Sequence, residues 1–83
     1  SGRIYLMNYE KRLSDNQQKR FAFMLKQKRK DSKLSQEALG DILGYGQADI
    51  YKWEACKTRP NFYQVEDVAT YFNLPLNVLI GEE

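Results

Sequence analysis

The residues from Gln47 to Lys52 carry side chains of the types that read base edges in DNA. Gln47 can pair bidentately with adenine or donate to guanine, and Ala48 can touch a thymine methyl group. Tyr51 and Lys52 can reach base edges or the flanking phosphates. On a helix of about two turns these four side chains share the outer face, so the segment is suited to the major groove of double-stranded DNA.

Asp49, which lies among these residues, has two interpretations. It is the third residue after Gly46, where a carboxylate stabilises the positive end of a helix. It could equally accept a hydrogen bond from a cytosine amino group. Under either interpretation, an acidic residue in this segment argues against unselective binding of polyanions.

The apolar pattern predicts two short helices around Gly44-Tyr45-Gly46. Ser35 is expected to cap the first helix and Gly46 the second. Buried positions are expected on the inner faces of both, as follows: Ala38, Leu39, Ile42 and Leu43 in the first, Ile50 and Trp53 in the second. Two helices joined by a tight turn are the arrangement that presents the second one to DNA.

The whole chain is predicted to be all-α, with five helices. Their expected ranges are 15–30, 36–43, 47–55, 62–72 and 76–80. Ser14 and Asn61 are expected to cap the first and fourth helices, and Pro75 to start the fifth. Residues 1–13 lack a sustained period and are interpreted as a flexible basic arm, part of which could derive from a tag, ahead of a domain over 14–83.

The ordered set Leu34-Ser35-Gln36-Glu37-x-Leu39, Gly44, Ile50, Trp53-Glu54 and Pro60, with Arg29 ahead of it, resembles the phage-repressor-like (Cro/repressor, XRE-type) helix-turn-helix family. The resemblance covers residues 21–81. It implies a lambda-repressor-like DNA-binding domain that acts as a transcriptional regulator, of the repressor type.

The resemblance also implies roles for individual residues. Arg29 and Glu54 would form a structural ion pair that ties the first helix to the end of the third. Phosphate contacts would come from Gln36, Tyr45, Gly46, Lys57, Thr58, Arg59 and Asn61. Cys56 stands where the family commonly has glycine in a left-handed conformation, which would strain a cysteine. Gly40 stands where the family usually has alanine, and is expected to permit close helix packing.

The small size of the domain bears on its expected partners. One small domain reads few base pairs, and family members usually bind as two-fold dimers. The expected seam of a homodimer is the C-terminal region, whose apolar residues are Leu74, Leu76, Val78, Leu79 and Ile80. The alternative function is an antitoxin or another protein-binding module on the same fold.

Composition limits the other classes. The 83 residues contain no histidine and one cysteine, so neither a metal, a cofactor, a disulfide nor an enzyme is expected. No apolar run is long enough for a membrane span, and a reducing cytoplasm is the simplest setting. Residues 1–33 hold ten Lys/Arg against three Asp/Glu, a balance of +7, while residues 34–83 hold three against eight, a balance of −5. Polyanions would orient on this asymmetry.

Overall fold

The computed structural model describes residues 12–81, and the secondary structure within that range is entirely helical. The helices are α2 (Asp15–Asp31), α3 (Gln36–Leu43), α4 (Gln47–Glu54), α5 (Phe62–Phe72) and α6 (Leu76–Ile80). The predicted all-α class and five helices are confirmed, with boundaries within one residue of those expected.

Local caps explain why the boundaries fall where they do. Ser14 and Gln17 form a reciprocal capping box at the start of α2, with hydrogen bonds of 3.0 and 3.1 Å. Ser35 accepts a hydrogen bond from the Ala38 amide at 2.9 Å at the start of α3. At the other end of α3, Gly44 adopts a left-handed φ of 82°, which glycine allows without steric cost. Each of these signals is short-range and can be read from sequence.

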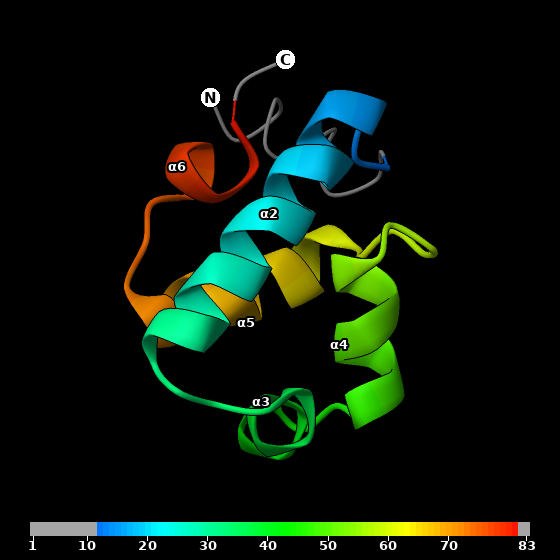
Figure 1. The fold of residues 1–83 in the computed structure, drawn as a ribbon. Coiled ribbons are helices and arrows are strands. Elements are labelled where there is room, and N and C mark those ends of the chain that lie inside the picture. Colours follow the sequence, from blue (N-terminus) through cyan, green and yellow to red (C-terminus); the bar gives the residue numbers. More distant parts are fainter. Residues whose placement is uncertain (1–11, 82–83) are drawn as a thin grey trace.

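The core lies where the five helices meet. In Figure 1, α4 and α6 flank α2 on opposite sides, and α3 lies beside α4. The largest fully buried side chains come from all five helices: Phe21, Leu25, Leu39, Ile50, Val65, Val68 and Leu79. This shared core fixes the orientation of α4 relative to the rest of the molecule.

Two expectations about burial were wrong. Ile42 was placed on the inner side of α3, but 49% of its surface is exposed. Leu13 was placed in the arm, but it is 2% exposed and belongs to the core. The core therefore includes Leu13, Arg12 is exposed, and residues 1–11 of the expected arm lie outside the described residues.

The C-terminal apolar residues are largely used inside the molecule. Leu79 and Ile80 are buried, and Leu74 and Leu76 pack partly buried against the core. This leaves less apolar surface for a subunit interface than the sequence suggests, because α6 packs its apolar side chains into the core. None of the helices in the described part of the chain is long and apolar enough to cross a membrane.

Candidate nucleic-acid interface

Helix α4 has a buried side and an exposed side. Ile50 is fully buried and Trp53 is 3% exposed. The opposite side exposes the predicted base-reading residues Gln47, Ala48, Tyr51 and Lys52. The helix therefore presents these four side chains to solvent, while Ile50 and Trp53 anchor its other side in the core.

Trp53 holds α4 by aromatic contacts within the core. Its ring meets that of Phe21 edge-on, with centroids 6.0 Å apart, and that of Tyr45 at 5.3 Å. Such edge-to-face pairs add to the free energy of simple apolar burial. Trp53 is thus a core residue and does not offer a ring face to a base.

The crossing of α3 and α4 is unusually close at Gly40. A Cβ atom on Gly40 would lie 2.8 Å from the carbonyl carbon of Gly46 and 2.9 Å from its oxygen. Real Cβ atoms do not approach backbone atoms so closely, so only glycine fits this backbone arrangement. The glycine at Gly40 thus sets the distance between the two helices of the motif.

Arg29 and Glu54 form the ion pair that the family resemblance implies. The guanidinium Nε and Nη2 donate to the two carboxylate oxygens of Glu54 at 2.7 and 2.9 Å, and Nη1 donates to the Leu34 carbonyl at 2.8 Å. The two side chains are 10% and 4% exposed. The hydrogen bond to Glu54 raises the pKa of Arg29, although burial opposes this shift. This bidentate pair fixes the end of α4 against α2.

Gln36 also joins this pair. Its Nε2 donates to Oε1 of Glu54 at 3.2 Å, which orients the carboxamide toward the protein. The second Nε2 hydrogen remains for another acceptor, so the expected phosphate contact stays a prediction. No sequence pattern predicted this internal partner, since Gln36 and Glu54 are 18 residues apart.

Tyr45, in the turn between α3 and α4, is half-buried and donates its hydroxyl hydrogen to Asp67 on α5. This hydrogen bond, with burial and the charge of Asp67, raises the pKa of Tyr45 to about 12. Tyr45 was expected to contact a DNA phosphate, and that contact stays a prediction. In the structure the hydroxyl connects the turn to α5, and no sequence pattern predicted that hydrogen bond.

Asp49 acts as a helix cap. One of its carboxylate oxygens accepts the Gly46 amide hydrogen at 3.4 Å, a long contact. Gly46 has no side chain to cap the helix, so Asp49 partly compensates at the first turn of α4. Of the two interpretations of Asp49, the structure contains the capping one, and the contact with cytosine stays a prediction.

A hollow of about 320 Å³ lies between α2, α3 and α4. Its lining consists of Lys26, Arg29, Lys30, Gln36, Tyr51, Glu54 and Ala55. Lys26 and Lys30 are exposed, whereas the Arg29–Glu54 pair is buried. Ala55 was absent from the predicted site, whereas Lys26 and Lys30 belong to the basic N-terminal part of the chain that was expected to attract polyanions. The spacing of lysines on α2 was visible in the sequence, but their position beside α4 depends on how the helices pack.

The segment after α4 divides into exposed and internally bonded residues. Lys57 and Thr58 are exposed. Arg59 instead donates to the Leu13 carbonyl at 2.7 Å and forms an ion pair with Asp15. The Asn61 side chain caps α5 by accepting from the Gln64 amide at 2.8 Å. Of the four phosphate ligands expected in this segment, Arg59 and Asn61 thus have structural partners that compete with that role.

Cys56 has the left-handed conformation that the comparison with glycine implied. Its φ is 57°, and it is exposed. A residue with a Cβ atom carries local strain in this conformation, of order 1–2 kcal/mol.

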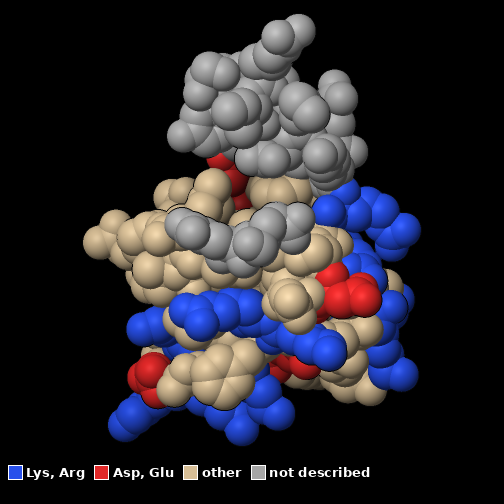
Figure 2. All heavy atoms as spheres, turned by 90° about the horizontal axis from the view of Figure 1, so that it is seen from above, with Lys and Arg blue, Asp and Glu red and all other residues tan. Residues whose placement is uncertain are grey.

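Basic side chains dominate part of the surface. Figure 2 shows Lys and Arg gathered over the half of the molecule away from the grey atoms, with fewer acids among them. On α2, Lys19, Lys26 and Lys30 are exposed and have the spacing of one helical face. Such a surface attracts the DNA backbone independently of sequence.

The sequence profile of the helix-turn-helix family (HTH_3) matches residues 25–79. The chain belongs to this family. It is accordingly a helix-turn-helix protein of the XRE, phage-repressor-like type, a class of DNA-binding regulators. No curated protein and no solved structure matched the chain at a significant level.

Proposed function

We propose that this helix-turn-helix protein is a sequence-specific regulator of transcription, of the repressor type, that inserts α4 into the major groove of double-stranded DNA. The observation that carries the proposal is the two-sided character of α4. Its inner side is fixed by Ile50, Trp53 and the Glu54–Arg29 pair. Its outer side carries Gln47, Ala48, Tyr51 and Lys52, which offer hydrogen-bonding and methyl groups to bases.

Backbone contacts would position the protein on the DNA. Lys57 and Thr58 are exposed in the segment after α4, and Lys26 and Lys30 are exposed at the hollow that Tyr51 and Ala55 also line. In this arrangement these side chains would hold phosphates next to the recognition helix, while α4 discriminates the sequence. Gln36 can contribute its second amide hydrogen at the start of α3.

Binding to an operator would use two copies, because one helix reads too few base pairs for selectivity. The apolar residues of α6 support this part of the proposal weakly, since the core already covers Leu79 and Ile80. A two-fold dimer would nonetheless place its half-sites about 34–36 Å apart, one turn of DNA.

Selection of bound duplexes from random DNA tests the proposal. The expected result is an enriched motif, with two inverted half-sites if the protein binds as a dimer. Binding without enrichment, or no binding, would overturn sequence-specific regulation. That outcome would favour the alternative of an antitoxin or other protein-binding module, in which the basic surface contacts a partner protein.

A further inference from the structure

The segment between α4 and α5 is held from two directions. On the α4 side, the Cys56 amide donates to the Trp53 carbonyl at 3.2 Å, and the Lys57 amide donates to the Lys52 carbonyl at 2.8 Å. These bonds continue the last turn of α4, and none of them involves the carbonyl of Cys56 or Thr58. Those two carbonyls stand on either side of Lys57.

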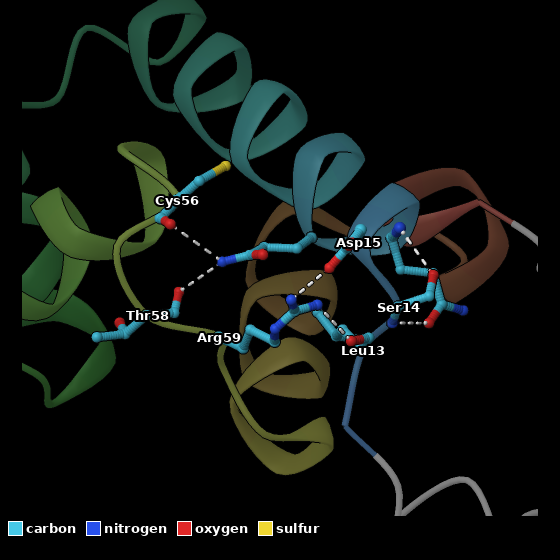
Figure 3. A network of polar contacts seen from close by, with 8 residues as sticks. Leu13, Ser14, Asp15, Cys56, Thr58 and Arg59 are labelled. Atoms are coloured by element: carbon cyan, nitrogen blue, oxygen red, sulfur yellow. Dashed lines mark hydrogen bonds and ion pairs between the residues drawn. The ribbon is translucent and has the colours of Figure 1, made fainter.

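One side chain binds both carbonyls. Nε2 of Gln18, on α2, donates to the Cys56 carbonyl at 3.3 Å and to the Thr58 carbonyl at 3.4 Å (Figure 3). A primary amide has two N–H groups on one nitrogen, so it can serve two acceptors at once. Gln18 therefore spans the backbone around Lys57 from a helix 38 residues earlier in the chain.

A second tie lies next to the first. Arg59 donates to the Leu13 carbonyl and pairs with Asp15, at the start of α2 (Figure 3). The hydrogen bond and the charge of Arg59 hold the pKa of Asp15 below its usual value. The first turn of α2 thus fixes the segment both around Lys57 and immediately after it.

We infer that Gln18 is a positioning residue for DNA binding: it holds the backbone on both sides of Lys57 so that Lys57 and Thr58 meet the DNA phosphates. The inference rests on the proposed function. Gln18 itself need not touch DNA. Without it, the α4–α5 segment loses one of its ties to α2 and keeps its bonds to α4 and, through Arg59, to the start of α2. The backbone around Lys57 then loses conformational entropy when Lys57 binds a phosphate, which lowers the affinity.

Gln18 carries no charge, so replacing it does not by itself remove an electrostatic contact with DNA. The full chain is compared with Gln18→Met, which keeps the side-chain length and removes the two donors, and with Lys57→Gln and the double variant. Gln27→Met is the matched control, since Gln27 is an exposed glutamine on the same helix. Affinity for the selected operator and for random duplex is measured over a range of salt concentrations.

The expected result is a weaker affinity for both duplexes by the same factor in Gln18→Met. The slope of log K against log salt should become shallower by up to about 0.9, the value for one phosphate contact, although no charge has been removed. Adding Gln18→Met to Lys57→Gln should change affinity little, because both act on one contact. Gln27→Met should match the wild type.

Equal slopes and affinities for Gln18→Met and Gln27→Met would overturn the inference, as would simple addition of the two losses in the double variant. Backbone order of Lys57 and Thr58 in the free protein, measured by NMR relaxation, gives a second readout that should fall in Gln18→Met. Unchanged order would also overturn the inference.

Gln18→Asn, whose side chain is one methylene shorter, replaces Gln18→Met if that variant does not fold. A wild type that enriches no sequence contradicts the proposed function, whereas a selective wild type with an indifferent Gln18 variant contradicts only this inference.

Discussion

A glutamine carboxamide can both donate to and accept from a base edge, so under the proposed function Gln47 is the most informative single substitution. Gln47→Ala should cost about 1–3 kcal/mol of binding free energy on the selected operator and relax the preference at one position per half-site. Titrations on operator and random duplex measure this. Lys57→Gln is the comparison, because it should weaken both duplexes about equally. Equal losses on both duplexes for Gln47→Ala would remove it from the base-reading residues.

Arg29 and Glu54 set a second prediction at the same scale. Arg29→Met leaves the Glu54 carboxylate, whose side chain is 4% exposed, with Gln36 as the partner that remains. The loss should be about 3–5 kcal/mol of unfolding free energy, because a buried charge without its counter-charge is costly. Replacing both residues by methionine should cost less than the sum of the single changes. Denaturant unfolding of the four proteins measures the coupling, and additive losses would show that the pair contributes nothing as a pair.

Tyr45 predicts a response to alkaline pH. Its pKa is raised in the folded protein to about 12 from an ordinary value of 10.0, so the fold favours the protonated phenol. The stability from this hydrogen bond is therefore complete below pH 10 and is lost as the pH rises from about 10 to about 12. Ultraviolet titration should show a late-ionising tyrosine that Tyr45→Phe removes.

Asp67→Asn provides the control for that titration. It removes the main cause of the shift, so the pKa of Tyr45 should return toward 10. A late-ionising tyrosine that persists in Tyr45→Phe would assign the shift to another residue.

At the scale of elements, the spacing of α3 and α4 depends on Gly40. Helix propensity alone favours alanine over glycine by about 1 kcal/mol. The contacts of 2.8 and 2.9 Å that a Cβ atom would make with Gly46 oppose this gain. Gly40→Ala should therefore destabilise the protein and reduce operator affinity, because the N-terminus of α4 has to move away from α3.

Asp41→Ala is the control for Gly40→Ala, since Asp41 is the next residue of α3 and is exposed. It should leave stability unchanged or slightly higher. Thermal unfolding of both variants checks the difference in sign, and a stabilised Gly40→Ala would show that the crossing relaxes at little cost.

The helices were predictable because their signals are local. Three helices are capped by a side chain that accepts from the amide three residues later: Ser14, Ser35 and Asn61. Residues so close in sequence are necessarily close in space, so a sequence pattern predicts the contact. Side-chain partners were harder to predict, because they lie across the fold. Tyr45 meets Asp67, 22 residues on, and Arg59 meets Asp15, 44 residues back.

The ion pair of Arg29 with Glu54 came from the family resemblance and not from spacing. The lysines of α2 show the remaining difficulty. Their helical face was readable, but their place beside Tyr51 follows from the angle at which α2 and α4 pack. Helix packing angles depend on the whole core and have no short sequence signature.

At the scale of the molecule, the charge asymmetry predicts a role for the basic arm. A chain beginning at Leu13 loses Arg3, Lys11 and Arg12 together with Glu10. It keeps the buried Leu13 and the carbonyl that accepts from Arg59, so it should fold. Affinity for DNA should fall and its salt dependence should become shallower, because fewer phosphates are neutralised.

A chain beginning at Ser14 is the counterpart. It removes the buried leucine as well, and should lose about 1.5–3 kcal/mol of stability, the cost of a core leucine. Circular dichroism melts and salt titrations of both shortened chains separate the two roles. Unchanged affinity and slope in the chain beginning at Leu13 would show that the arm does not serve DNA binding.

Cys56 gives the molecule a practical property. It is the single thiol of the chain, and it is exposed. A maleimide dye or a nitroxide would therefore attach at one known place, two residues beyond the last residue of the recognition helix, without prior removal or introduction of any cysteine. The emission or line shape of such a probe would report the approach of a duplex and the motion of the neighbouring backbone in the otherwise native protein.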